Sequence, residues 1–279
     1  MKRLIILLLL LPSYMFAQDV KFPYETGKIK EIYLYGTGGA LWSSYILGKR
    51  WKKPLDNKKI KQLKISEVNI IDRFACYNYN NSLNKTREHL EPISTVLAIG
   101  GTFAMSYIND YRESSRQKLL VMGNMYLEGL LLTTGIVQST KTYIDRARPF
   151  AYNKHVGNGR MTSDNNESFM SGNASLMFYN SVFIAKTFND IYPNSKYTKW
   201  VWAGSLALSC SSAYMSVKSG HHFLTDVITG AAIGSLIGYF IPVMHYRNDF
   251  KYKHTEFTGS ISPLLLPNGL GINLAISIL

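Results

Sequence analysis

Lys141 and Arg148 are residues whose types and spacing could bind a phosphate group. They lie seven positions apart, which on a helix places both cations on one face, and Pro149 would end that helix. Two cations at a helix end can bind an oxyanion, and an arginine can hold two of its oxygens at once. Arg146 and Asp145 would then point elsewhere. Taken alone, the segment also fits a solvated basic helix end.

Ser171, Gly172 and Asn173 form a second candidate segment, at the start of an uncharged stretch. Serine, glycine and asparagine are all common at the N-cap of a helix. A glycine there lets backbone N–H groups come close to an anion, and the positive end of the helix dipole favours a negative charge. By itself, the pattern is more often an ordinary helix cap than an anion site.

His222 and Asp226 form the third candidate, because a spacing of four places them on one face of a helix. A carboxylate beside an imidazole fixes which ring nitrogen carries the proton and raises the basicity of the ring. The other ring nitrogen can then attack a substrate or accept a proton. The chain has six histidines and no His-Glu-x-x-His pattern, so we expect no metal site.

The order and spacing of the three segments resemble the motifs of the type 2 phosphatidic acid phosphatase family, which shares its fold with the vanadium haloperoxidases. The family pattern is Lys, six residues and Arg-Pro, then Pro-Ser-Gly-His, then Ser-Arg, five residues, His, three residues and Asp. The resemblance covers about residues 90–245, and the matching residues are Lys141, Arg148, Pro149, Ser171, Gly172, His222 and Asp226. It implies an all-α helical bundle of the acid phosphatase and vanadium haloperoxidase type, with the site where three helix termini meet.

The resemblance also implies a role for each matching residue. His222 would be the nucleophile that takes the phosphoryl group and forms a phosphohistidine, and Asp226 would orient it. The phosphate oxygens would be held by Lys141, Arg148, Ser171 and the backbone amide of Gly172. Hydrolysis would need no metal or other cofactor, because positioning and charge neutralisation supply most of the catalysis of phosphoryl transfer. The implied substrate is a phosphomonoester, and the basic surface and apolar helices favour a lipid phosphate.

Two positions depart from the family pattern where the chemistry needs them. Asn173 replaces the histidine that protonates the leaving group, and an asparagine cannot release a proton at neutral pH. Ser216 replaces an arginine, and a serine has neither its charge nor its paired donors. Losing a general acid typically costs roughly 10²–10⁴-fold in rate. Nearby residues that could compensate are Lys218, His155 and His221.

These departures leave two hypotheses about function. The first is an exported phosphatase that hydrolyses a phosphomonoester with impaired activity or altered acid chemistry. The second is a non-catalytic phosphate- or lipid-binding pseudophosphatase of the cell envelope. Retention of His222 and Asp226 favours the first, whereas the loss of both the acid and the arginine favours the second. A vanadate-dependent peroxidase is disfavoured, because that site needs the same missing residues.

The composition limits the class of protein. Charged residues are 18% of the 279 residues, which excludes general disorder, and Cys76 and Cys210 are too few for a disulfide scaffold or a cysteine-rich zinc module. The net charge of +13 indicates an anionic partner, such as a phosphate ester or an anionic membrane surface. Nucleic acid is not expected, because no zinc-finger spacing, RNA-binding motif or long basic run is present.

The chain divides into four parts by pattern. Residues 1–18 have the basic start, short apolar stretch and small final residues of a secretory signal peptide, which predicts export to a periplasm or cell envelope. Residues 19–90 form a basic region that suggests no chemistry, and residues 91–246 form the phosphatase-like helical domain. In the tail, residues 247–279, apolar residues alternate as in a β-strand, after a turn-like Pro-Asn-Gly sequence.

Four stretches without Asp, Glu, Lys or Arg are each just long enough to cross a membrane: residues 92–109, 168–185, 200–217 and 227–244. A fifth stretch, residues 119–140, is interrupted by Glu128. Their small residues suit close packing in a membrane bundle. The same composition suits the buried helices of a compact soluble bundle. The mean hydropathy of −0.05 slightly favours the soluble or peripherally bound alternative.

Overall fold

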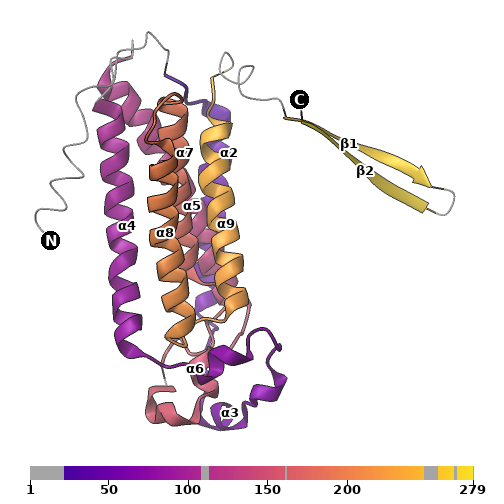
Figure 1. Ribbon diagram of the computed structural model, residues 1–279. Coiled ribbons are helices and arrows are strands. Elements are labelled where there is room, and N and C mark those ends of the chain that lie inside the picture. Colours follow the sequence, from indigo (N-terminus) through magenta and orange to yellow (C-terminus); the bar gives the residue numbers. More distant parts are fainter. Residues whose placement is uncertain (1–21, 108–112, 161, 248–256, 267–268, 279) are drawn as a thin grey trace, which may run out of the picture.

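The computed structural model describes residues 22–107, 113–160, 162–247, 257–266 and 269–278, so the predicted signal peptide lies outside the described residues. The described residues form an elongated helical bundle, as the all-α prediction requires (Figure 1). Its long helices are α2 (Lys28–Lys49), α4 (Asn81–Tyr107), α5 (Ser115–Tyr143), α7 (Gly172–Ile191), α8 (Thr198–Lys218) and α9 (Leu224–Met244). Short segments gather at one end, namely α3 (Asn57–Gln62), α6 (Pro149–Tyr152) and the 3₁₀ segments η1 (Ile65–Glu67), η2 (Arg73–Tyr77) and η3 (Lys154–Arg160).

Helix α7 lies at the centre of the bundle, packed against α4, α5, α8 and α9. Its contact with α9 is close, because α9 presents Gly230, Gly234 and Gly238 at every fourth position on one face. A Cβ atom at Gly234 would lie 2.0 Å from the carbonyl oxygen of Ser175, so this position admits only glycine without a shift of α7. Small residues at this spacing let two helix backbones approach each other.

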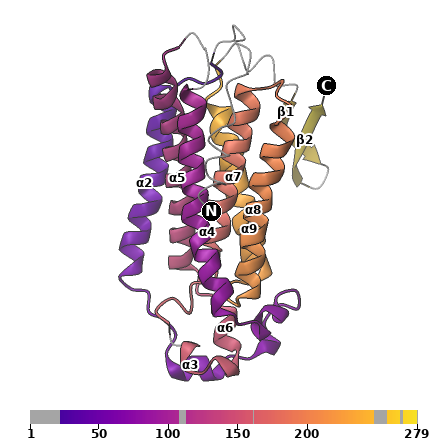
Figure 2. The same cartoon turned by 60° about the vertical axis from the view of Figure 1, so that its left-hand side comes forward.

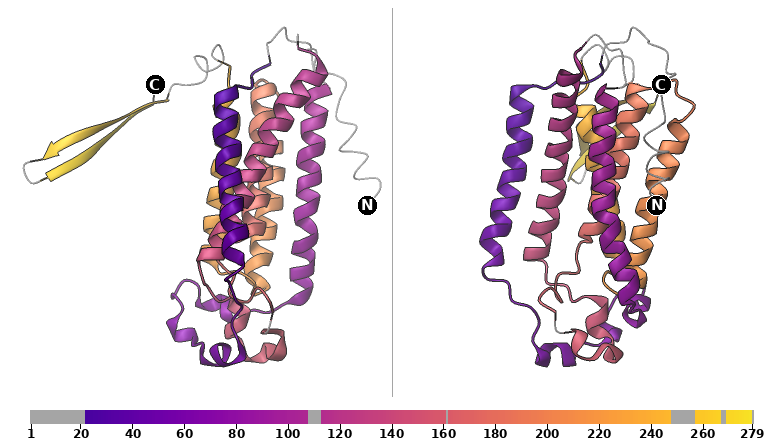
Figure 3. Two further views of the ribbon diagram at one scale, coloured as in Figure 1. Left: turned by 180° about the vertical axis from the view of Figure 1, so that it is seen from behind. Right: turned by 90° about the vertical axis from the view of Figure 1, so that its left-hand side faces the viewer.

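Helix α2 lies at the edge of the bundle beside α5 (Figure 2; Figure 3). A Cβ atom at Gly38 would lie 2.6 Å from Cγ of Leu131, and the hydroxyl of Ser139 donates a 2.8 Å hydrogen bond to the carbonyl oxygen of Leu41. Helix α2 is therefore part of the bundle. The boundary predicted after residue 90 falls inside α4, because that helix already begins at Asn81.

Capping side chains and one glycine set where the helices near the short segments begin. Ser171 caps α7 by accepting a hydrogen bond from the backbone of Ala174, 3.3 Å away. Between α8 and α9, Gly220 has a φ of +74°, and a Cβ atom there would lie 2.1 Å from the carbonyl oxygen of Asn78. The turn that leads into α9 therefore requires glycine.

The C-terminal tail forms the strand structure that its alternating pattern predicts. Strands β1 (Phe257–Leu266) and β2 (Gly269–Ile278) pair antiparallel, and the register places Leu266 opposite Gly269.

The two cysteines are not paired with each other. Cys76 is buried and Cys210 is exposed, and neither forms a disulfide within the described part of the chain.

The outer surface of the bundle carries large apolar side chains. On α4, Val96 is 67% exposed, and on α9, Leu236 is 52% exposed, with Phe103 and Phe240 similarly uncovered. Within the described residues, α5 and α9 are the helices long and apolar enough to cross a membrane by length and composition. Exposed apolar surface on this scale favours the membrane bundle over the soluble one.

Candidate active site

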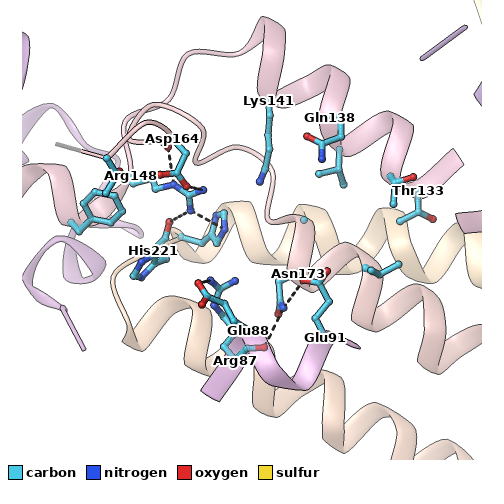
Figure 4. Close-up of a pocket in the computed structure, with 17 residues that line it drawn as sticks. Arg87, Glu88, Glu91, Thr133, Gln138, Lys141, Arg148, Asp164, Asn173 and His221 are labelled. Carbon is cyan, nitrogen blue, oxygen red and sulfur yellow. Dashed lines mark hydrogen bonds and ion pairs between the residues drawn. The ribbon is translucent and has the colours of Figure 1, made fainter. Parts of the chain in front are cut away.

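A pocket of about 420 Å³ lies at the end of the bundle that carries the short segments. Four of the predicted site residues line it, and so does one of the two departed positions. These are Lys141, Arg148, Gly172, His222 and Asn173. Figure 4 shows Lys141 and Arg148 entering the pocket from different parts of the chain, with Asn173 and Glu91 facing them.

The geometry that brings Lys141 and Arg148 together differs from the predicted one. They do not share a helix, because α5 ends at Tyr143 and Arg148 is the N-cap of α6. An extended loop joins the two helices, and the backbone N–H of Arg148 donates to the carbonyl oxygen of Asn165 at 2.8 Å. The loop, rather than a two-turn helical spacing, therefore directs both cations into the pocket.

Arg146 anchors this loop to the start of α9 and does not line the pocket that Lys141 and Arg148 share. Its guanidinium forms an ion pair with Asp226, lies 2.8 Å from Asp72, and stacks over the ring of Phe223 at 4.3 Å. Asp72 also accepts hydrogen bonds from the backbone and the hydroxyl of Thr225. The region before residue 81 thus contributes a buried carboxylate that fixes the site loop, which the sequence did not indicate.

Arg148 is held from several sides. Its Nε donates to the carbonyl oxygen of Asp164 at 2.9 Å, and its Nη2 lies 2.7 Å from the Asp164 carboxylate. Its Nη1 donates to the carbonyl oxygen of His221 and lies 3.2 Å from Nε2 of His222. Although burial acts to raise it, the charge of Arg148 lowers the pKa of Asp164. A guanidinium fixed in this way is pre-organised to bind an oxyanion.

His222 presents one unprotonated ring nitrogen to the pocket. Its Nδ1 lies 2.8 Å from the carbonyl oxygen of Ser168, which assigns the proton to Nδ1 and leaves a lone pair on Nε2. That lone pair accepts a hydrogen bond from Arg148 at the pocket wall. Burial, together with the charges of Arg148 and Lys141, lowers the pKa of His222 to about 3, although Asp226 acts to raise it. The imidazole is therefore neutral at physiological pH, as nucleophilic attack requires.

Asp226 lies beside His222, as the four-residue spacing predicts, with 3.9 Å between its carboxylate and Nδ1 of His222. The two residues do not share a helix, because α9 begins at Leu224 and His222 precedes it. The carboxylate also accepts hydrogen bonds from the hydroxyl of Ser168 and the backbone of Phe223. Asp226 therefore borders His222 directly and also contacts Ser168, whose carbonyl oxygen holds the imidazole.

Ser171 and Ser216 lie outside the pocket, whereas Gly172 forms part of its wall. Ser171 is fully buried and is occupied in capping α7. Ser216 is also fully buried, and its hydroxyl donates to the carbonyl oxygen of Ser212 at 2.9 Å. A Cβ atom at Gly172 would lie 3.1 Å from Cγ1 of Val137, so glycine lets α7 begin close to α5 at the pocket wall.

Asn173 connects three helices at the pocket wall. Its side-chain amide donates to the carboxylate of Glu91 on α4 at 2.9 Å, and its side-chain oxygen accepts from the hydroxyl of Ser212 on α8. Asn173 itself is on α7. The residue therefore has a clear structural role, and it supplies no proton to a leaving group.

The nearby residues suggested as substitutes for the missing groups are differently placed. Lys218 and His155 are exposed and do not line the pocket, and the ammonium of Lys218 lies over the ring of Tyr214. His221 does line the pocket and packs against Phe150. Burial, with the charges of Arg148 and Arg87, lowers the pKa of His221 to about 4. A histidine that is neutral at pH 7 is a poor proton donor.

Three pocket residues come from α4 and belong to no motif of the resemblance: Arg87, Glu88 and Glu91. Arg87 is buried, with 7% of its surface exposed. A signal for them exists in the sequence, because Asn84, Arg87, Glu88 and Glu91 follow the three-four spacing of one helix face. That polar face directly precedes the uncharged stretch that starts at residue 92.

Two comparisons of the sequence with known proteins agree with the motif-based resemblance. Residues 123–250 match the family model of the PAP2 superfamily. The chain is 26% identical over 159 residues to a lipid A 4'-phosphatase of Porphyromonas gingivalis, and the match covers 55% of this chain and 61% of that relative. A crystal structure of a transmembrane PAP2 type phosphatidylglycerolphosphate phosphatase from Bacillus subtilis aligns with a TM-score of 0.46 and 18% identity, covering 78% of this chain and 98% of that one.

The matched region contains all three motifs, from Lys141 to Asp226, together with the two positions that depart from the pattern. Helix α4 and its pocket residues precede it. The resemblance predicted from the spacing of the motifs is confirmed, because residues 123–250 of this chain match the PAP2 superfamily.

Proposed function

We propose that this protein is a membrane-embedded lipid phosphomonoesterase that uses His222 as its nucleophile. The observation that carries the proposal is the unprotonated Nε2 of His222, which faces a pocket that Lys141 and Arg148 also line. Phosphoryl transfer to a histidine requires a lone pair on the imidazole that attacks phosphorus and cations that neutralise the phosphate oxygens. The match to the PAP2 superfamily supports the assignment.

The reaction has two steps. Nε2 of His222 attacks phosphorus, a P–N bond forms, and the ester P–O bond breaks to release the alcohol, whose oxygen takes a proton from water. Water then attacks the phosphohistidine, the P–N bond breaks, and inorganic phosphate leaves. Lys141 and Arg148 neutralise the charge on the phosphate oxygens in both steps, and Arg148 exchanges its hydrogen bond with the imidazole for one with the substrate.

A lipid is the substrate class that the surface favours. The pocket lies at one end of a bundle whose sides carry exposed apolar residues, so a membrane around the bundle would place lipid headgroups near the pocket. The lipid A 4'-phosphatase relative acts on such a substrate by its name. The net charge of +13 suits an anionic membrane surface. The signal-like N-terminus supports a place in the cell envelope.

A non-catalytic pseudophosphatase is the second candidate, and Asn173 and Ser216 favour it. Neither residue supplies the group that the family pattern has at its position, and both are engaged in hydrogen bonds within the bundle. Such a protein would bind a phosphate headgroup in the pocket without releasing phosphate.

Phosphate release by the full chain in detergent separates the two candidates. Phosphatidic acid, lipid A and p-nitrophenyl phosphate would be assayed beside a His222→Ala variant of equal thermal stability. We expect release by the wild type, none by His222→Ala, and a phosphorylated peptide containing His222 by mass spectrometry. Equal release by both proteins would refute the role of His222. Phosphate binding without release by a folded wild type would establish the pseudophosphatase.

A further inference from the structure

We propose that Arg87 of α4 is a third phosphate-binding cation, and that it takes the place of the arginine that the family pattern has at Ser216. This inference rests on the proposed function and extends it to a residue outside the matched PAP2 region. Arg87, Lys141 and Arg148 line the same pocket and come from three separate parts of the chain (Figure 4).

The hydrogen bonds of Arg87 leave one end of its guanidinium for a ligand. Its Nε and Nη2 lie 3.2 and 2.6 Å from Oδ1 of Asn84, and Nη2 lies 3.5 Å from the half-solvated carboxylate of Glu88. Among the described residues, no group accepts a hydrogen bond from Nη1. Asn84 and Glu88 thus fix the plane of the guanidinium, and Nη1 is the donor available to an oxyanion in the pocket.

Three cations and three carboxylates line the pocket, and Glu91 among them accepts a hydrogen bond from Asn173 rather than pairing with a cation. Arg87 and Arg148 are both buried, and each contributes to the low pKa of His221 between them. Asp164 neutralises Arg148, and Glu88 lies at the outer edge of Arg87, but Lys141 has no carboxylate within salt-bridge distance among the described residues. Buried like charges repel each other unless a counterion separates them. A phosphate dianion supplies that counterion.

Asn173 connects Arg87 to the phosphate-binding helix N-terminus. Its amide donates to Glu91, one helical turn from Arg87, and lies 3.4 Å from the Arg87 carbonyl oxygen. A histidine at this position could not make the same pair of contacts from one amide nitrogen. The two departures from the family pattern are therefore connected: α4 supplies the guanidinium missing at Ser216, and Asn173 holds α4 in register with α7.

The test removes the guanidinium from α4 and then places one on α8, at the position of Ser216. We expect Arg87→Ser to lower kcat/KM by about 10²–10³-fold, the usual effect of removing one oxyanion donor. The double variant Arg87→Ser with Ser216→Arg should recover at least a tenth of the wild-type value, because it restores the family arrangement. Lys85→Ser is the matched control, since it removes an exposed cation from the same helix and should leave the rate unchanged.

A binding measurement keeps this inference separate from the proposed function. The thermal shift caused by inorganic phosphate should shrink in Arg87→Ser and persist in Lys85→Ser, whether or not the wild type hydrolyses lipids. If Arg87→Ser fails to fold, Arg87→Gln removes the charge and keeps a long polar side chain. Wild-type rates and phosphate shifts in a folded Arg87→Ser or Arg87→Gln protein would overturn the proposal. Loss in Arg87→Ser without any recovery in the double variant would assign Arg87 a purely structural role.

Discussion

The closest contact of the His222 imidazole that fixes its protonation is with a backbone carbonyl oxygen, and the Asp226 carboxylate lies further away. The carbonyl oxygen of Ser168 fixes the tautomer, and burial keeps the ring neutral, with a pKa of about 3. The Asp226 carboxylate accepts a hydrogen bond from the hydroxyl of Ser168 and forms an ion pair with Arg146. In the proposed mechanism His222 therefore needs no deprotonation step near pH 7, and the remaining requirement is a proton for the leaving group.

Asn173→His tests the leaving-group chemistry at the residue scale. The imidazole would restore a general acid, so hydrolysis of phosphatidic acid, whose leaving alkoxide needs a proton, should rise by up to about 10²-fold. Hydrolysis of p-nitrophenyl phosphate should change little, because p-nitrophenolate is a stable anion. The measurement is the ratio of kcat for the two substrates in both proteins.

Asn173→Gln is the control for that experiment, because it keeps an amide and adds no acid. A fall in both rates for Asn173→His would mean that the link to Glu91 matters more than the restored proton. An equal rise for both substrates would contradict a general-acid effect.

The motif residues were the predictable part of the site. Lys141, Arg148, Gly172 and His222 line the pocket as their spacing indicates. Helical spacing failed as a guide to their geometry, because α5 ends before Arg148 and α9 begins after His222. Both interruptions depend on tertiary contacts, such as the hydrogen bond between the Arg148 N–H and Asn165, that local spacing does not encode.

At the scale of elements, the uncharged stretches predicted helices correctly, and their small residues predicted close packing. The stretch from residue 227 became α9, whose glycines lie against α7. The contribution of α4 was not predicted, because a polar face at the start of a helix usually faces solvent. Only the packing of α4 on α7 and α8 turns that face into a pocket wall.

Gly234→Ala tests the contact between α7 and α9. Its Cβ atom would meet the Ser175 carbonyl oxygen, and overpacking of this kind costs about 1–3 kcal/mol. We expect a lower melting temperature in detergent and weaker activity, since α7 and α9 carry Asn173 and the turn of His222. Gly204→Ala on α8 meets nothing within 4 Å and should be neutral or slightly stabilising. Equal melting temperatures for the two variants would contradict the tight contact.

At the scale of the whole molecule, the exposed apolar surface predicts that lipid surrounds the helices. Cys210 reports on this, because it is exposed and lies within α8. In proteoliposomes a charged maleimide should not label Cys210, since the reagent and the thiolate both need water. Cys76 should stay unlabelled in the folded protein for a different reason, because burial raises its pKa to about 11.

A Cys210→Ser protein with Lys154→Cys is the matched control, because Lys154 is exposed among the short segments at the pocket end. The new thiol should react readily in proteoliposomes that are open to the reagent on both sides. Rapid labelling of Cys210 under the same conditions would show that water reaches α8 and would contradict a membrane-embedded bundle.

The separation of Arg87 from His222 along the chain has a consequence for biosynthesis. Helix α4 leaves the ribosome long before α9, so its Asn84 and Arg87 side chains, buried in the finished bundle, stay uncovered until the later helices arrive. A nascent chain that stalls after α8 lacks the nucleophile and leaves that turn open. The proposed phosphate pocket is therefore complete only in the finished bundle, and phosphate binding would distinguish completed molecules from incomplete ones.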